Sequence, residues 1–129
     1  MRSGSVVAGG ILGTLARWWV EGFFALSPPG FPWGTLLVNV TGAFALGMVG
    51  VILIERVTHF GYLRTFLGIG LLGSYTTFST MALEGVQLIE SRRLGLAASY
   101  WIVTLALGQM AGVYGMWLGR LRFPRRKET

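Results

Sequence analysis

The chain has 129 residues, of which 53% are hydrophobic and only 12% are charged, and its formal net charge is +6. This composition lies far from that of a soluble globular protein and predicts an integral membrane protein of one domain. The sequence has no cysteine or aspartate, and its one histidine is His59. Thiolate chemistry, a Ser-His-Asp triad and a histidine metal cluster therefore lack their residues, so we do not expect an enzyme.

Charged residues divide the chain into four apolar segments. A helix needs about 20 apolar residues to cross the ~30 Å hydrocarbon core, and the prolines of "LSPPGFPWG" mark a loop between the first two segments. We therefore expect an all-α fold, with a single four-helix transmembrane domain over residues 1–129 and a basic tail at 120–129. The expected helices are residues 4–25, 33–54, 64–91 and 94–119, to within a few residues.

The first apolar segment also resembles a cleaved secretory signal peptide. Residues 6–16 are apolar, follow Arg2 and precede the tripeptide "ALS". Arg17 interrupts the apolar stretch, however, and three further apolar segments come after it. We expect this segment to stay in the protein as the first transmembrane helix.

Glycine is frequent, with 20 residues. Lipid gives no hydrophobic driving force between helices, so small residues that allow close backbone approach contribute more to helix association. Within the expected helices, three pairs have the spacing Gly-x-x-x-Gly: Gly9 and Gly13, Gly108 and Gly112, and Gly115 and Gly119. They indicate close packing or a dimer, and four helices alone have little room to enclose a pathway.

A polar patch interrupts the third apolar segment, where residues 71–81 read "LLGSYTTFSTM". Glycine costs about 1 kcal/mol relative to alanine in a helix, and Ser or Thr side chains compete for backbone hydrogen bonds. We expect the helix to break here, near the membrane midplane; a continuous helix whose hydroxyls bond neighbouring helices is the alternative. A break suits an ion, because one half-helix ends in free carbonyls and the other begins with free N–H groups.

Uncharged hydrogen-bond donors lie on the second and fourth helices. Asn39 is in the middle of the second, where it serves an anion or forms a hydrogen bond between helices. Tyr100, Thr104 and Gly108 follow at intervals of four and form a stripe on the fourth helix, which is either a donor track or a set of polar groups near one end. Together with the ring edge of Phe78, these groups suit a small, hard anion, and the membrane centre offers no carboxylate for a proton-coupled cation exporter.

Three stretches, "GGILGTLAR", "GTLLVNVTGAFALG" and "GLLGSYTTFSTMALE", resemble the Fluc (CrcB) family of fluoride channels. The resemblance covers the first three helices in order and extends more weakly through the fourth. Its specific features are the Thr-Thr-Phe-Ser-Thr core with a glycine upstream, and the asparagine inside Gly-Thr-x-x-x-Asn-x-x-Gly.

The resemblance implies a fluoride-selective channel that exports cytoplasmic fluoride passively across the inner (plasma) membrane, built as an antiparallel, dual-topology homodimer with two pores. It also implies a structural sodium ion at the dimer interface, held by the backbone carbonyls of Gly73 and Thr76. The implied partners are fluoride, the lipid bilayer and a second copy of the chain, with no nucleic acid. Carried onto this sequence, the pore residues are Asn39, Phe78, Met81, Ser79, Thr80, Tyr100 and Thr104.

Two pore positions depart from the family pattern. Met81 stands where a second phenylalanine is common, which leaves one ring and a polarizable thioether. Gly108 stands where a serine often supplies a hydroxyl. Both departures bear on the details of conduction and leave the scaffold unchanged.

The distribution of basic residues is a third departure. Three, Arg17, Arg92 and Arg93, are expected toward one side of the membrane. Eight are expected on the other side: Arg2, Arg56, Arg64, Arg120, Arg122, Arg125, Arg126 and Lys127. This bias favours both termini in the cytoplasm, whereas dual insertion is easier near balance. Five of the eight lie in the tail, which is synthesised last, and a heterodimer with an oppositely oriented paralogue is the alternative to the homodimer.

The remaining charges have mostly structural interpretations. Arg17 and Glu21 have i, i+4 spacing and are expected to pair, with a vestibule or dimer-interface role as the alternative for Arg17. Glu84 either lines a pore mouth or pairs with a basic residue, and the basic tail suits anionic lipid headgroups. Two other functions stay open: a small multidrug-type four-helix exporter, which needs a carboxylate deeper in the first helix than Glu21, and a non-conducting membrane assembly subunit.

Overall fold

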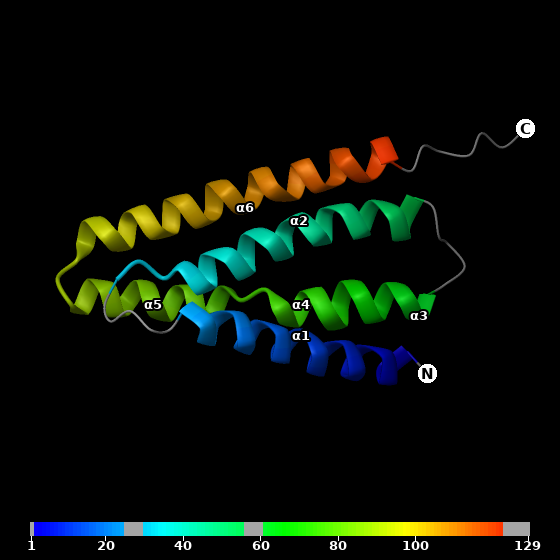
Figure 1. The fold of residues 1–129 in the computed structure, drawn as a ribbon, viewed down its shortest axis with the longest axis horizontal. Coiled ribbons are helices and arrows are strands. Elements are labelled where there is room, and N and C mark those ends of the chain that lie inside the picture. Colours follow the sequence, from blue (N-terminus) through cyan, green and yellow to red (C-terminus); the bar gives the residue numbers. More distant parts are fainter. Residues whose placement is uncertain (1, 25–29, 56–60, 123–129) are drawn as a thin grey trace, which may run out of the picture.

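The described part of the protein is all-helical. The computed structural model describes residues 2–24, 30–55 and 61–122, and no strand occurs among them. Four helical segments run up and down beside one another (Figure 1): α1 (Arg2–Phe24), α2 (Trp33–Glu55), a third segment over residues 61–90, and α6 (Leu94–Arg122). α1 begins and α6 ends at the same end of the bundle. Four features singled out in the sequence lie outside the described residues: the tripeptide "ALS", Arg56, His59 and the tail after Arg122.

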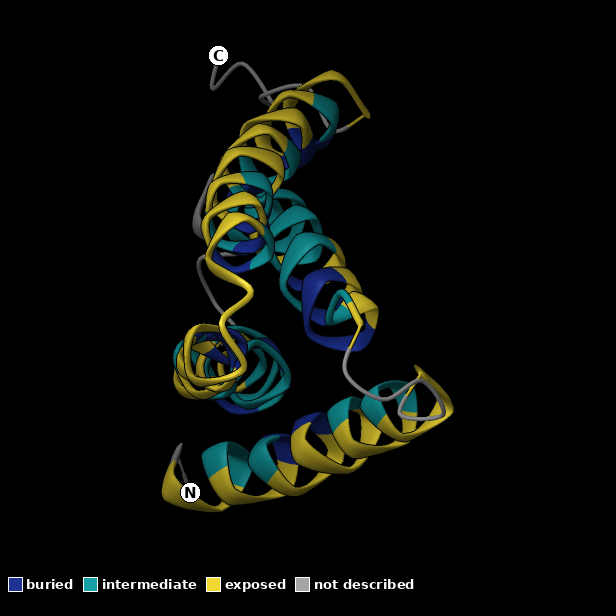
Figure 2. Ribbon diagram, turned by 90° about the vertical axis from the view of Figure 1, so that its left-hand side faces the viewer, coloured by how far each residue is buried: buried dark blue, intermediate teal, exposed yellow. Residues whose placement is uncertain are grey.

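Within the described residues, three segments are long and apolar enough to cross a membrane: Trp33–Leu53, Gly61–Glu90 and Leu94–Arg122. α1 has the same length as α2, 23 residues. It is not one of the three, because Arg17, Glu21 and its small polar residues lower its mean hydropathy. Large hydrophobic side chains are exposed on all four segments, and Figure 2 shows exposed residues along the outer sides of α1 and α6. The chain is a multi-pass membrane protein whose outer faces suit lipid.

The third segment is broken near its middle. Its first half comprises α3 (Gly61–Arg64), the π-helix η1 (Thr65–Leu72) and α4 (Gly73–Tyr75), and its second half is α5 (Phe78–Glu90). Between the halves, Thr76 (φ −74°, ψ 150°) and Thr77 (φ −146°, ψ 117°) are extended. The break predicted from "LLGSYTTFSTM" is confirmed, and the continuous helix considered as its alternative is wrong.

A tight turn reverses the chain from α5 into α6. Arg92 adopts a left-handed φ of 58°. Its N–H donates to Ile89 O and the N–H of Arg93 donates to Leu88 O, both at 2.9 Å. This pair of bonds is the Schellman motif, which satisfies carbonyls at the end of a helix.

α1 packs against the first half of the third segment. Glycine makes this close approach possible, since a Cβ on Gly9 would overlap Phe66 O and a Cβ on Gly13 would overlap Leu71 O. Gly70 of η1 lies opposite, and a Cβ built there would stand 3.0 Å from Gly9 Cα. The first Gly-x-x-x-Gly pair therefore packs within the chain.

α2 packs along α6, again through glycine. A Cβ on Gly47 would overlap Gly112 O, and one on Gly115 would overlap Phe44 O. Gly108 differs, because a Cβ there would have no atom within 4 Å. Packing inside the chain is thus the observed use of most of the spaced glycines.

A small buried core joins α5 to α6. Its members are Met81, Leu88, Ala97 and Tyr100. Trp101 packs beside this core, and its indole Nε1 donates to Met81 O at 3.3 Å. The ring of Trp101 fills the place where a Cβ on Gly85 would stand, so the two helices approach through one glycine and one tryptophan.

Candidate functional site

The break is held by Asn39 of α2. Asn39 Nδ2 donates to Thr77 O at 2.9 Å, and Thr77 N donates to Asn39 Oδ1 at 2.8 Å. Because Thr77 is extended, its backbone groups have left the helical ladder, and one side-chain amide satisfies both of them. Asn39 therefore makes the hydrogen bond between helices that was one of its two predicted roles. The second hydrogen of Nδ2 is not used in this pair of bonds.

Thr77 also caps the start of α5. Its Oγ1 accepts from Thr80 N at 3.2 Å, as the side chain of an N-cap residue does. The same Oγ1 donates to Thr80 Oγ1 at 3.0 Å and lies 3.2 Å from Ser79 Oγ. Ser79 and Thr80, two of the predicted pore residues, thus form one hydroxyl cluster with Thr77 at the positive end of a helix.

Two carbonyls at the break lose their usual donors. In a continuous α-helix, the amides of Thr77 and Thr80 would bond the carbonyls of Gly73 and Thr76. Here Thr77 N donates to the Asn39 side chain and Thr80 N donates to the Thr77 hydroxyl. These are the two carbonyls predicted to hold sodium, and carbonyls freed at an unwound helix are suitable ligands for that ion. The donor set therefore fits the expected cation.

Glu84 joins three helices through both of its carboxylate oxygens. Thr35 Oγ1 donates to Oε1 at 2.9 Å, and the hydroxyl of Tyr100 donates to Oε2 at 2.7 Å. Neither donor is basic, so these bonds differ from the pairing with a basic residue that was one of the two predictions for Glu84. Tyr100 has 0% of its surface exposed, which makes Glu84 a link between the helix ends and the interior of the bundle.

An open cavity of 380 Å³ lies where α1 ends, α2 begins and α5 ends. Glu21, Thr35 and Glu84 are among the residues that line it. Glu21 Oε1 is buried and has no hydrogen-bond partner within the residues that the structure describes. The predicted pairing with Arg17 therefore does not reach this oxygen. Glu84 extends from the cavity wall to the buried hydroxyl of Tyr100.

Thr104 lies one helical turn beyond Tyr100 on α6. Its side chain is only 3% exposed, and its Oγ1 has no hydrogen-bond partner among the described residues. A buried hydroxyl normally has a partner, so one without is a candidate contact for an ion or a second chain. Tyr100 and Thr104 share the predicted stripe, and the structure places both inside the protomer.

Phe78 and Met81 have opposite environments. Phe78, the first residue of α5, is 72% exposed, whereas Met81 is 4% exposed and belongs to the core between α5 and α6. The ring and the thioether that were predicted to act together are thus not equally accessible in one protomer. An ion that meets the edge of Phe78 does so on the outer surface of this chain.

Some residues of the site were missed by reasoning from the sequence. Thr35 lies one turn before Asn39 on α2, so their shared face was a signal that these two polar residues meet the same neighbour. Thr77 directly precedes a helix, and threonine is favoured at that position because its side chain bonds the free amides. The link from Glu84 to Tyr100 depends on how α5 meets α6, which spacing along the chain does not give.

Comparison with known proteins gives one consistent result. Residues 5–116 match the family described as CrcB-like protein, Camphor Resistance (CrcB). A relative from Mycobacterium bovis, named Fluoride-specific ion channel FluC 1, is 45% identical over 107 residues, which cover 83% of this chain and 81% of the relative. Fluoride-specific ion channel FluC from Agrobacterium fabrum is 39% identical over 119 residues, or 92% of this chain and 95% of that protein. Fluoride-specific ion channel FluC 3 from Yersinia pestis is 37% identical over 113 residues, or 85% and 90% of the two chains. On this match and these identities, the chain belongs to the CrcB-like family.

Proposed function

We propose that this protein is a fluoride-selective ion channel that lets cytoplasmic fluoride leave the cell passively and so lowers its toxicity. The observation that carries the proposal is the buried hydroxyl of Thr104, which has no hydrogen-bond partner among the described residues and lies one turn from the buried Tyr100. Uncharged donors of this kind, in a chain whose relatives are named fluoride-specific ion channels, suit a small anion that must exchange its water for hydrogen bonds.

The proposed path begins in the cavity beside Glu84 and continues along α6. Tyr100 donates its one hydrogen to Glu84, so passage requires this hydroxyl to turn from the carboxylate to the ion. Thr104 then offers a hydroxyl that no described residue uses. The second Nδ2 hydrogen of Asn39 and the ring edge of Phe78 are the further donors that we assign to the path, beside Ser79 and Thr80.

The functional unit that we propose is an antiparallel, dual-topology homodimer. Phe78, Ile69 and Leu83 are 72%, 63% and 58% exposed on the broken segment, and a second chain against this surface would complete a path that one protomer leaves open. An oppositely oriented paralogue is the alternative partner, because the basic residues are unevenly distributed. Terminal tags accessible in comparable amounts from both sides of the inner (plasma) membrane are expected for the homodimer. Tags accessible from one side alone would point to the paralogue.

A structural sodium ion completes the proposal. The carbonyls of Gly73 and Thr76 would hold it, since the amides that normally bond them are engaged by side chains. When bound, the ion would supply a fixed positive charge at the dimer interface. Asn39 and the Thr77 hydroxyl keep these carbonyls free by taking the two amides.

Fluoride efflux from liposomes tests the function directly. Purified protein should release trapped fluoride, measured with a fluoride electrode, without a proton gradient and with chloride released far more slowly. Efflux of organic cations driven by a proton gradient would favour the multidrug exporter instead. A folded protein that releases neither would favour the membrane assembly subunit.

A further inference from the structure

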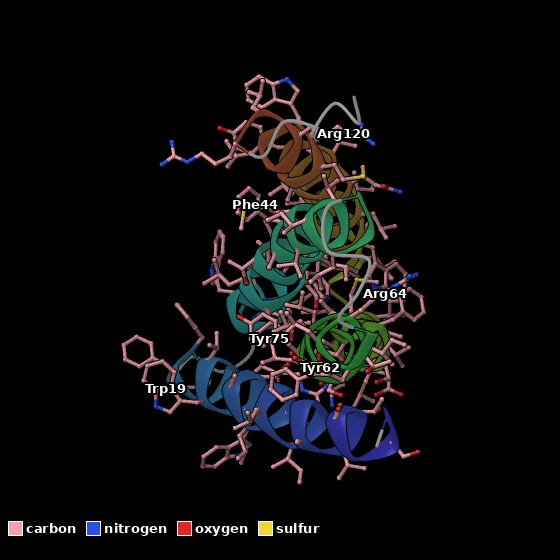
Figure 3. All side chains as sticks on the ribbon, turned by 90° about the vertical axis from the view of Figure 1, so that its right-hand side faces the viewer. Trp19, Phe44, Tyr62, Arg64, Tyr75 and Arg120 are labelled. Atoms are coloured by element: carbon pink, nitrogen blue, oxygen red, sulfur yellow. The ribbon has the colours of Figure 1, made fainter. Side chains whose placement is uncertain are left out.

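Three consecutive residues at the break all contact one short part of α2. Figure 3 shows Tyr75 in the space between α1 and α2. The three pairs are Tyr75 with Thr41, Thr76 with Gly42, and Thr77 with Asn39. The first pair lies in the last helical turn before the break and the other two lie at the extended residues themselves, so α2 contacts the break along its whole length.

The direction of the hydrogen bond between Tyr75 and Thr41 follows from counting hydrogens. Thr41 Oγ1 donates to Leu37 O of the preceding turn at 2.6 Å. A hydroxyl has one hydrogen, so Thr41 Oγ1 is an acceptor in its 3.1 Å contact with the hydroxyl of Tyr75. Tyr75 is therefore the donor, and its bond ties the last helical turn before the break to α2.

The neighbouring contact shows how closely the break lies against α2. A Cβ on Gly42 would overlap Cγ2 of Thr76 and stand 3.1 Å from Cδ1 of Tyr75. Thr76 is also tied to its own helix, since its N–H donates to Leu72 O at 3.1 Å. The backbone that carries the Gly73 and Thr76 carbonyls is thus held against α2 by a hydrogen bond at Tyr75, by packing at Gly42 and by the Asn39 bonds to Thr77.

We propose that Tyr75 and Thr41 form a latch, a hydrogen bond that positions the carbonyls of Gly73 and Thr76. The latch thereby sets how tightly the proposed sodium ion at the dimer interface is held. Tyr75 and Thr41 are positioning residues, because they act through the backbone and touch neither the cation nor the anion. This inference rests on the proposed sodium site and adds two side chains to it. Without the latch, the last turn of the first half would lose one of its ties to α2, ion binding would have to supply the lost order, and the apparent sodium affinity would fall.

Sodium titrations of matched variants test the latch. Tyr75→Phe removes the donor hydroxyl. Thr41→Val removes the hydroxyl that accepts this bond and keeps the shape of the threonine side chain. We expect each variant to need about three- to tenfold more sodium than the parent, the range given by one net hydrogen bond. The double variant should show the same shift and not the product of two, because both changes remove one interaction. Tyr114→Phe, on the exposed side of α6, is the control and should leave the sodium requirement unchanged.

Two readouts keep the sodium site and the latch separate. One is thermal stabilisation of the purified dimer by sodium, with potassium holding the ionic strength constant, and the other is the sodium dependence of fluoride efflux. A parent protein that responds to sodium in neither readout would overturn the proposed sodium site itself. A sodium-sensitive parent with unshifted Tyr75→Phe and Thr41→Val variants, or with shifts that multiply in the double variant, would overturn the latch alone. If Tyr75→Phe fails to fold, Thr41→Val and the Tyr114→Phe control decide the question.

Discussion

Asn39 and Thr77 are separated by 38 positions in the chain and are joined by two hydrogen bonds, one in each direction. A single amide side chain therefore replaces both backbone bonds that Thr77 loses where the helix breaks. Few substitutions can preserve this exchange, because it needs one donor and one acceptor on the same planar group.

Asn39→Asp should weaken the break and stop fluoride efflux. The carboxylate still accepts from Thr77 N, but its second oxygen faces Thr77 O where a donor stood, and it adds a negative charge beside an anion path. We expect a loss of about 1–3 kcal/mol in stability, as for one unsatisfied buried group. Thermal unfolding in detergent and the fluoride electrode measure the two effects. Efflux at the parental rate would show that Asn39 does not line the pore.

Phe78→Ile should abolish efflux and leave the fold intact. The side chain is 72% exposed in one protomer, so little packing is lost, whereas the positive ring edge that we assign to the anion disappears. Val86→Ile, an exposed apolar change on the same helix, is the matched control and should conduct normally. If both variants conduct alike, Phe78 is a surface residue and no ligand.

Thr104→Val should raise stability and lower conduction. The Thr104 hydroxyl is buried and has no partner in the described part of the chain, so replacing it with a methyl group removes a desolvation cost of about 1–3 kcal/mol. The same change deletes a donor from the proposed path. Thr104→Ser keeps the hydroxyl and should keep efflux. A Val variant that is less stable than the parent would mean that the hydroxyl has a partner in the dimer.

Gly115→Ala and Gly108→Ala should have opposite effects on stability. A Cβ at position 115 would overlap Phe44 O, and forcing α2 away from α6 is expected to cost about 1–3 kcal/mol. Position 108 has open space, so alanine there should gain about 0.5–1 kcal/mol from its better helix propensity. Thermal unfolding of the two variants side by side decides the matter. Destabilisation at 108 would place a neighbouring chain against that glycine.

Gly73→Ala tests for a partner at the break. A Cβ on Gly73 would lie 3.5 Å from Gly68 O, an ordinary contact, so one protomer has room for it. The fold should tolerate the change, and any loss of dimer or of sodium dependence would come from groups outside the chain. Size-exclusion chromatography with light scattering measures the dimer. An unaffected dimer with parental efflux would show that no partner chain packs against the Cα of Gly73.

The helices could be predicted from the sequence because the residues that mark their ends lie within or next to them in the chain. The second helix was predicted at 33–54 and observed at Trp33–Glu55, since Pro32 and the charge at Glu55 mark its ends. The break was predicted for the same reason: Gly73 and the hydroxyl residues after it weaken a helix wherever they occur. The π-helix η1 was not foreseen, because "TFLGIGLL" suits either winding.

The contacts of the site were harder to predict from the sequence, because they depend on the register between helices. Asn39 was identified as a buried amide. Its partner, Thr77, depends on where along its length α2 passes the break, which the sequence does not give. Glu84 was given two roles, and only the arrangement of α5 and α6 brings it to the hydroxyl of Tyr100. The pore assignments stay predictions, since they concern surfaces such as Phe78 that a second chain would complete.

The contact between Gly85 and Trp101 restricts how this protein can change over generations. Any side chain at position 85 would overlap the indole ring in its present place, so replacing the glycine first forces Trp101 to move. A smaller residue at position 101 has to come earlier, at the temporary loss of the indole bond to Met81 O. Of the two orders in which a lineage could exchange these residues, the one that begins at Trp101 avoids displacing the indole ring, and even that one passes through an intermediate that lacks the indole bond.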